Sequence, residues 1–215
     1  MIRNVFDIYN RNWSQILTWS FLIILPVTIL SYLSMVYVYS SNEGITPHYI
    51  AGLAFFLNFI LCIPPFVKMV LIDKQDDVFK PVDGLIFFVK QFGLLVILTS
   101  IIYWIAIVGI LFLFIPTFVG LLFLLVFPFF SEGRSVKTVI SNTTKTIVRE
   151  NISLLGDLIV MISINVGLWV AMLQFLAQFE NNLLAYIIIR VVLNILVFPL
   201  LYIYLTLRYR NDPAI

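Results

Sequence analysis

Residues 92–130 read FGLLVILTSIIYWIAIVGILFLFIPTFVGLLFLLVFPFF, a run of 39 residues without one charged side chain. A single straight helix of this length would extend about 58 Å, nearly twice the roughly 30 Å hydrocarbon thickness of a bilayer. The chain therefore has to turn back within the run, and Pro116 marks the place because proline interrupts the helical hydrogen-bond ladder. We expect two membrane-spanning helices joined by a turn at residues 109–117.

Four other segments are also long and apolar enough to cross a membrane, which takes roughly 20 apolar residues. They are Trp13–Val38, Ile50–Ile72, Ile152–Leu176 and Leu183–Leu207. The composition agrees, since 62% of the residues are hydrophobic and the mean hydropathy is +1.07. The predicted fold class is all-α, a polytopic membrane helical bundle. Residues 1–215 form a single integral membrane domain with six transmembrane helices arranged as three hairpins.

The basic residues are distributed unevenly over the loops that this count defines. If six helices cross and the N-terminus is cytoplasmic, 12 of the 13 basic residues lie on the cytoplasmic side, and the thirteenth, Arg190, lies within the last helix. Joining residues 92–130 into one crossing would move the four basic residues from Arg134 to Arg149 outside, which the positive-inside rule disfavours. We therefore expect both termini in the cytoplasm and a multi-pass protein of the plasma, or inner, membrane.

A short cytoplasmic amphipathic helix is predicted before each hairpin, because apolar residues recur there at helical spacing. The apolar positions are Ile2, Val5, Phe6, Tyr9 and Trp13 in the first, Val82, Leu85, Ile86 and Val89 (after Pro81) in the second, and Val136, Val139, Ile140, Thr143 and Ile147 in the third. Basic residues beside the third helix form a candidate docking face, which consists of Arg134, Lys137, Lys145 and Arg149. Each basic residue near anionic lipid headgroups contributes about 1 kcal/mol of attraction. The face can also serve a membrane or cytoplasmic protein partner, or the helices can be connecting elements only.

The three hairpins resemble one another, which suggests a threefold repeat with units 1–77, 78–133 and 134–215. Each returning helix carries a proline after an apolar residue, at Pro64, Pro128 and Pro199. Internal repeats are frequent in membrane folds. A series of unrelated hairpins also needs basic entry residues and tolerates such prolines, so both interpretations stay open.

Polar residues inside the predicted spans are the first candidates for a functional site. The candidate intramembrane polar seam consists of Arg190, Asn194, Asn165, Asn58 and Asp157. Ionisable residues at such depth face the bundle interior or a watery cavity, although Arg190 can instead extend to the outer interface and meet Glu180. Asparagines form hydrogen bonds between membrane helices of about 0.6 to 2 kcal/mol each. The seam therefore either lines a substrate path or holds the helices together.

Catalytic and metal-binding motifs are absent from the sequence. His48 is the only histidine and Cys62 the only cysteine, so no intramolecular disulfide can form and no second such ligand is available for a metal. Asp73, Asp76 and Asp77 alternate with lysines, a pattern more typical of a hydrated loop than of a cation site. The net charge of +2 is too small to indicate nucleic-acid binding. We expect no enzyme activity and no cofactor.

One region resembles a known family. The strings FIP at residues 114–116, FPFFSEGRSV at 127–136 and VREN at 148–151 are similar to a pattern in small bacterial membrane proteins. That group includes the membrane domain of glycerophosphodiester phosphodiesterases and the related YciC-like proteins. The resemblance implies a stand-alone membrane part, because the strings of the family's soluble catalytic barrel are not found in this chain. It carries no functional residue over to this sequence.

Two classes of function fit these observations. The first is a non-enzymatic accessory, regulatory or immunity-type envelope protein that acts through a partner, which the basic cytoplasmic helices favour. The alternative is a small transporter or exporter of an amphiphilic or lipid-like substrate, which the polar seam favours.

Overall fold

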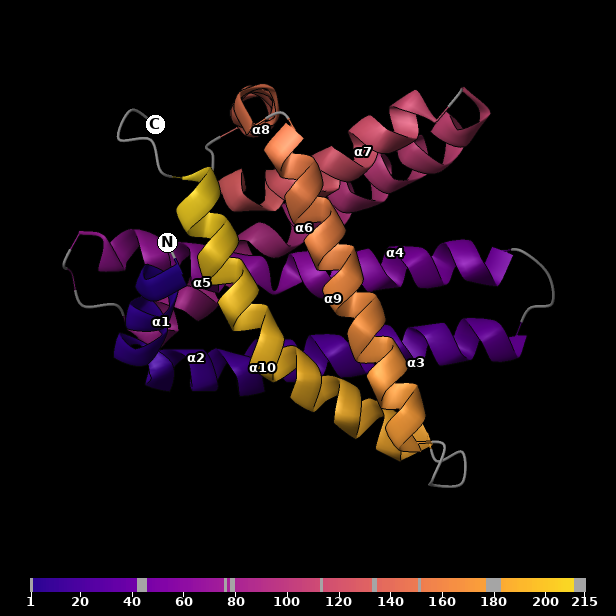
Figure 1. The fold of residues 1–215 in the computed structure, drawn as a ribbon, viewed down its shortest axis with the longest axis horizontal. Coiled ribbons are helices and arrows are strands. Elements are labelled where there is room, and N and C mark those ends of the chain that lie inside the picture. The colour runs from indigo at the N-terminus through magenta and orange to yellow at the C-terminus, as the bar shows by residue number, and fades with distance from the viewer. Residues whose placement is uncertain are drawn as a thin grey trace.

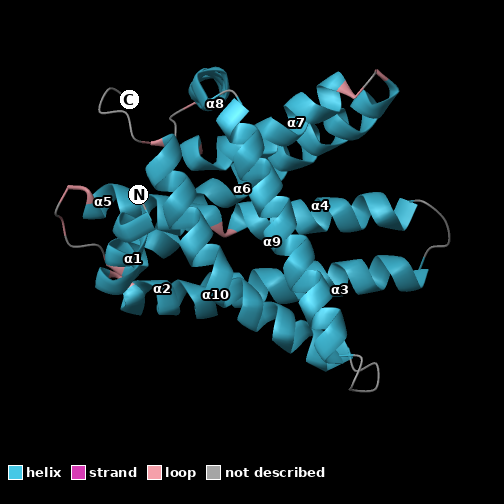
Figure 2. Cartoon of the chain, viewed as in Figure 1, coloured by secondary structure: helices cyan, strands magenta, loops and turns pink. Residues whose placement is uncertain are grey.

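The computed structural model describes residues 2–41, 46–75, 77, 80–112, 114–132, 135–150, 152–176 and 183–210, and for part of residues 152–176 it describes the backbone only. All regular structure in these residues is helical, and Figure 2 shows no strand among them. The all-α prediction is therefore confirmed.

The helices follow one another with short connections (Figure 1). In chain order they are α1 (Ile2–Arg11), α2 (Trp13–Trp19), a π-helical segment (Ser20–Ile24), α3 (Leu25–Ser41), α4 (Thr46–Leu61), α5 (Ile63–Asp73), α6 (Pro81–Val108), a 3-10 turn (Gly109–Leu111), α7 (Ile115–Val126), a second 3-10 turn (Phe127–Phe130), α8 (Val136–Glu150), α9 (Ile152–Leu176) and α10 (Leu183–Tyr209). The π-helical segment joins α2 to α3 without a loop, and α4 continues into α5 through Cys62 alone.

Several helices have the length and composition of membrane spans. Within the described residues, four stretches are long and apolar enough to cross a membrane: Trp13–Ser41, His48–Asp73, Pro81–Leu111 and Leu184–Tyr209. A further apolar stretch, Ile115–Phe130, is shorter. At 1.5 Å per residue it extends about 24 Å, somewhat less than the hydrocarbon thickness. All five overlap segments that the sequence predicts to cross, and they fit a membrane protein.

The long uncharged run does turn back, at the position that the sequence predicts. α6 ends at Val108, and Phe114 adopts a left-handed conformation with φ of 62° just before α7. The Thr117 hydroxyl donates a hydrogen bond of 2.6 Å to the carbonyl of Ala106, which caps the end of α6. A Cβ atom on Gly109 would lie 2.6 Å from the backbone nitrogen of Thr117, so the turn closes tightly only with glycine there.

The second predicted amphipathic helix is not a separate element, and on this point the prediction was wrong. α6 begins at Pro81 and continues unbroken through Val108. The Trp19 indole nitrogen donates a hydrogen bond of 3.1 Å to the Pro81 carbonyl, and its ring covers Gly84, where a Cβ would lie 2.6 Å from the ring. This contact holds the first turns of α6 against the helix that contains Trp19, so no break separates them from the rest of α6.

The first and third amphipathic helices are separate elements, each with a local signal at one end. α1 ends at Arg11, where the Asn12 side-chain amide donates to the carbonyl of Ile8 at 3.0 Å. α8 begins after Ser135, whose hydroxyl accepts the backbone N–H of Thr138 at 3.2 Å, as expected of an N-terminal cap. α1 packs against α10, and α8 packs against α7.

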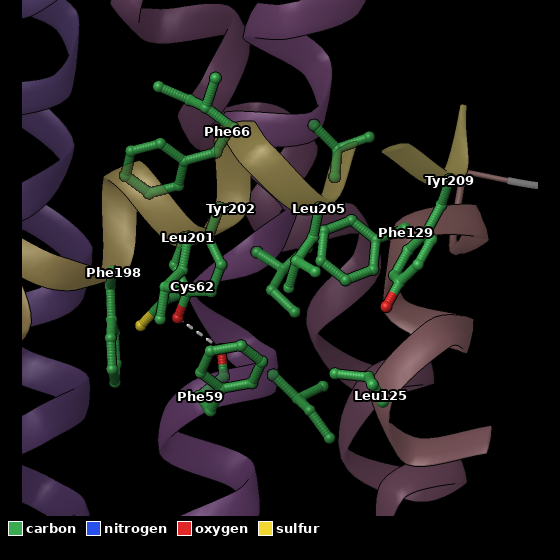
Figure 3. Close-up of a cluster of buried hydrophobic side chains, with 14 of the residues drawn as sticks. Phe59, Cys62, Phe66, Leu125, Phe129, Phe198, Leu201, Tyr202, Leu205 and Tyr209 are labelled. Carbon is green, nitrogen blue, oxygen red and sulfur yellow. Dashed lines mark hydrogen bonds between the residues drawn. The ribbon is translucent and has the colours of Figure 1, made fainter. Parts of the chain in front are cut away.

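The core is aromatic and surrounds the break between α4 and α5 (Figure 3). Phe59 and Phe198 pack edge to face with ring centroids 5.5 Å apart, and Tyr202 lies against both rings. The Tyr202 hydroxyl donates to the carbonyl of Phe59 at 2.7 Å. Pro64 and Pro65 follow the break and have no backbone N–H, and the Tyr202 hydroxyl adds a hydrogen bond from α10 to α4 just before it. Cys62 is a free, fully buried side chain, as expected of an apolar filler.

α10 connects the other parts of the bundle. It contacts α1, α3, α5 and α9, and in Figure 1 it runs obliquely across α5 and the stretch that joins α2 to α3. The polar residues of α10 therefore reach partners that are far apart in the sequence.

Candidate functional site

A buried polar cluster joins α3, α4 and α10. We define it as Thr28, Tyr32, Asn58, Arg190 and Asn194. The Asn194 side-chain amide donates to the Thr28 hydroxyl at 3.0 Å, and the Thr28 hydroxyl donates to the Asn58 side-chain carbonyl at 3.1 Å. All three side chains are at most 4% exposed. The structure thus brings together Asn58 and Asn194, two of the asparagines in the predicted seam. Thr28, which links them, was not predicted from the sequence.

Thr28 was missed because the helix geometry changes just before it. The segment Ser20–Ile24 is π-helical, which places an extra residue in one turn and shifts the face on which later residues lie. Pro26 follows within the same stretch. A regular helical pattern counted from Trp13 therefore assigns Thr28 to the wrong side of the span. The available signal was the proline, which is a known cause of such irregularity.

Arg190 lies one turn before Asn194 on α10 and belongs to the same cluster. It is 1% exposed, and Tyr32 on α3, itself 8% exposed, interacts with its guanidinium electrostatically. Tyr32 also packs with Ile187 and Val191, so apolar side chains lie beside this pair. The sequence allows Arg190 to face the bundle interior or to extend to the outer interface, and its burial corresponds to the first of these. Glu180, the alternative partner, lies outside the described residues.

The predicted seam has two other members, Asn165 and Asp157. Asn165 is part of α9, but its side chain lies outside the described residues. Asp157 is buried elsewhere: the Arg208 Nε atom lies 2.9 Å from its carboxylate, and the Tyr209 hydroxyl donates to it at 3.3 Å. Asp157 lies near the start of α9, and its nearest cation therefore comes from the last turn of α10.

An ionic cluster surrounds the end of α10, and we define it as Glu132, Arg149, Glu150, Asp157, Arg208 and Arg210. Arg208 also donates to the Tyr204 hydroxyl at 2.9 Å, and Arg149 donates to the Tyr209 carbonyl at 3.1 Å. Arg210 donates to the Phe129 carbonyl at 2.9 Å and pairs with the Glu132 carboxylate. Burial lowers the pKa of the Arg210 guanidinium, an effect that Glu132 partly offsets. Two of these contacts pair carbonyl groups near helix C-terminal ends, those of Tyr209 in α10 and Phe129 in the second 3-10 turn.

Three residues of the candidate docking face are described on α8. Lys137, Lys145 and Arg149 are all exposed on the helix surface. Arg149 also pairs with Glu150 at 3.1 Å and with the end of α10, so it connects the docking face to the ionic cluster. Arg134 lies outside the described residues. A shallow depression along the helix is lined by Lys145 and its neighbours Ser141, Thr144, Val148 and Arg149.

The described residues contain no group of three or more histidine, cysteine or acidic side chains that could hold a metal ion. His48 is exposed, and its Nδ1 atom forms a hydrogen bond of 2.9 Å with the Tyr39 hydroxyl. This contact joins the end of α3 to the start of α4.

Comparisons of the chain with protein-family models, with curated proteins and with solved structures find no match. The resemblance to the phosphodiesterase membrane domain therefore stays a prediction. Function has to be argued from the polar cluster, the ionic cluster and α8.

Proposed function

We propose that the chain crosses the plasma membrane six times as three hairpins, with both termini in the cytoplasm. Two contacts support this arrangement. Arg11, before the first predicted span, pairs with Asp73, after the second, at 2.7 Å. Arg149, before the fifth, donates to the carbonyl of Tyr209, after the sixth. Each contact connects the entry of one predicted hairpin to its own exit, as expected when both lie at the same membrane face.

Cysteine labelling in intact cells tests this topology. A Lys145→Cys variant should resist a membrane-impermeant maleimide until the cells are opened, because α8 is cytoplasmic in this arrangement. A His48→Cys variant should react in intact cells, because it lies in the first outer loop. Native Cys62 is buried and provides little background. The reverse pattern of labelling would contradict six crossings with a cytoplasmic N-terminus.

We further propose that the protein is non-enzymatic and acts through a partner that docks on the cytoplasmic face of α8. The observation that carries this proposal is the division of α8 into three faces. Val139, Thr143 and Thr146 are buried against the bundle. Val136 and Ile140 remain exposed on one flank, and Lys137 and Lys145 are exposed on another.

This division fits a helix that lies in the membrane interface. Its apolar flank contacts acyl chains, while its lysine flank faces water and anionic headgroups. The lysines then remain accessible to a soluble or membrane partner with an acidic surface. This placement supports our proposal of an accessory, regulatory or immunity-type role in the cell envelope.

Photocrosslinking from α8 tests the partner. A photoreactive residue at Lys137 or Lys145 should give one defined adduct in native membranes, and replacing the other lysine with glutamate should weaken it. The same residue at Lys90, exposed on α6, is the matched control. Equal adducts from Lys90, or none from α8 in several detergents, would contradict docking at this helix.

A second function, transport of an amphiphilic or lipid-like substrate, is favoured by the polar cluster. Arg190 is a cation inside a predicted span and is only 1% exposed, which is a common feature of substrate paths. The π-helical segment before Thr28 adds a helix irregularity of the kind often found at functional sites. Reconstituted vesicles should then move a short-chain fluorescent phospholipid, and Arg190→Leu should lower the rate more than Arg190→Lys. An Arg190→Leu rate equal to that of the native chain would remove Arg190 from any transport path.

A further inference from the structure

We propose that the turn between α6 and α7 is inserted among the acyl chains of the outer leaflet and does not project into water. The exposed residues that the structure describes in this turn are all apolar, and we call them the apolar turn: Ile110, Leu111, Phe112, Phe114 and Ile115. None of them belongs to the polar cluster, the ionic cluster or α8. The inference rests on the proposed topology, which identifies the leaflet as the outer one.

The sequence around the turn lacks the residues that typically form a water-exposed loop. The segment from Ile101 to Pro116, IIYWIAIVGILFLFIP, has no charged residue and no serine, threonine, asparagine or glutamine. The hydroxyl of Thr117, the next residue, is used within the protein, because it donates to the Ala106 carbonyl. The other two predicted outer loops contain an acidic residue and several further polar ones. The composition of this turn therefore favours a surrounding other than water.

Protein does not cover the apolar turn. Its four most exposed side chains are each at least 64% exposed: Leu111, Phe112, Phe114 and Ile115. In Figure 1 the end of the α6–α7 hairpin lies apart from the ends of α3 and α4. Contiguous apolar side chains of this size are uncommon on surfaces that face water. They are favourable where acyl chains surround them.

The apolar turn continues the lipid-facing side of α6. Ile97, Ile101 and Ile105 recur at every fourth position, so they share one side of the helix, and each is more than half exposed. They lie within a stretch that is long and apolar enough to cross a membrane, so in the proposed topology they face acyl chains. No polar side chain separates this row from the apolar turn. The lipid-facing surface therefore extends over the turn instead of ending below it.

Phe114 occupies a position at which glycine or asparagine is expected in a water-exposed turn. Its φ of 62° lies in the left-handed region, which is unfavourable for a bulky side chain. Since the side chain is exposed, packing within the protein does not explain a phenylalanine there. Contact between its ring and acyl chains does explain it.

The length of the hairpin agrees with this placement. At 1.5 Å per residue, the uncharged part of α6 from Phe92 to Val108 extends about 25 Å, and the returning stretch Ile115–Phe130 about 24 Å. Both are shorter than the hydrocarbon thickness of about 30 Å. Any tilt of the two helices brings the turn deeper. Measured from either end of the hairpin, the turn therefore reaches the acyl chains of the outer leaflet without passing beyond them.

The backbone of the turn finds hydrogen-bond partners within the hairpin, as a lipid surrounding requires. The Phe112 N–H donates to the Gly109 carbonyl at 2.9 Å, and the Phe118 N–H donates to the Phe114 carbonyl at 3.0 Å. Pro116 has no N–H that would need a partner. These features reduce the number of polar groups that insertion would leave without a partner.

Spin-label accessibility tests the inference. The purified full chain carries one nitroxide at Phe112→Cys and is reconstituted into vesicles of phosphatidylethanolamine and phosphatidylglycerol. Oxygen concentrates in hydrocarbon, whereas a charge-neutral nickel chelate stays mainly in water. We expect the Phe112→Cys label to collide more often with oxygen than with the chelate, as a label at Ile101→Cys in the middle of α6 does. A label at His48→Cys, in the first outer loop, is the matched control and should show the reverse order.

All three positions are exposed, so the labels replace no packed side chain, and native Cys62 is buried. A Phe112→Cys label that collides more often with the chelate, as at His48→Cys, would overturn insertion of the turn. A defined protein adduct from a photoreactive residue at Phe112 in native membranes would also overturn the proposal, because a protein and not lipid would then cover the turn. Adducts with lipid only would support it.

Maleimide labelling of intact cells separates this inference from the topology on which it rests. We expect an impermeant maleimide to label His48→Cys and to leave Phe112→Cys unlabelled, before and after the cells are opened. Labelling of both variants in intact cells would overturn insertion and leave the topology standing. Labelling of His48→Cys only after the cells are opened would overturn the topology, and with it the outer leaflet as the place of the turn.

Discussion

Replacing Thr28 with valine removes the link on which the polar cluster depends, while the shape of the side chain hardly changes. The Thr28 hydroxyl accepts from Asn194 at 3.0 Å and donates to Asn58 at 3.1 Å, so one substitution removes two hydrogen bonds between helices. Such bonds in membrane proteins contribute about 0.6 kcal/mol on average and up to about 1.7 kcal/mol. We therefore expect the free energy of unfolding to fall by about 1 to 3 kcal/mol.

The assay is reversible unfolding of the chain in bicelles by increasing SDS. Thr18→Val is the matched control, because the Thr18 hydroxyl donates only to the Ser14 carbonyl of its own helix, at 2.9 Å. That variant should change the free energy by less than about 0.5 kcal/mol, since no contact between helices is lost. Thr28→Ser keeps the hydroxyl and should retain most of the native stability.

A double-mutant cycle then separates the link from the packing around it. If Thr28 and Asn194 act through their hydrogen bond, Asn194→Leu costs less in the Thr28→Val background than in the native chain. Equal costs in the two backgrounds, or a Thr28→Val variant as stable as Thr18→Val, would refute the reasoning.

Three further predictions concern packing. Gly120→Ala should lower the free energy of unfolding by about 1 to 3 kcal/mol, because its new Cβ would lie 2.8 Å from the Cβ of Ala106 and would force α6 and α7 apart. Gly93 has open space around it, so Gly93→Ala should be neutral or slightly stabilising in the same SDS assay. Tyr202→Phe should cost about 1 kcal/mol in that assay, because the carbonyl beside the α4–α5 break loses a donor. Cys62 should react with maleimide only after unfolding, and fast labelling of the native chain would show that the core is open.

The sequence predicted which segments are helical and where the long run turns back better than it predicted which segments join into one helix. Apolar length and Pro116 were enough to place the turn between α6 and α7, because a bilayer limits how long an apolar helix can be. The same reasoning separated residues 81–90 from α6. Periodicity describes only one helix face, and the contact that keeps this segment continuous comes from Trp19, 62 residues before Pro81. Contacts of that range leave no periodic signal.

The candidate site was predicted in part for a related reason. Asparagines within apolar helices are costly unless they find partners, so Asn58 and Asn194 were identifiable from their depth alone. Thr28 was not, because a threonine can bond to its own helix and because the π-helical segment before it shifts the face on which it lies. Arg149 was assigned to a surface because its position on α8 is exposed. Its hydrogen bond to the end of α10 depends on how two distant helices meet.

The positions of the polar residues along α10 explain why this helix contacts so many others. Arg190 and Arg208 are 18 residues apart, which is about 27 Å along a helix and close to the thickness of the hydrocarbon. Between them lie Asn194 and Tyr202, which bond to Thr28 and to the Phe59 carbonyl at different depths. Apolar packing alone scarcely distinguishes one position of a helix from another, because lipid tails are as apolar as leucine. Polar contacts near both ends of α10 fix its depth and rotation. The helix therefore cannot slide or turn without losing Thr28 at one end and Asp157 at the other.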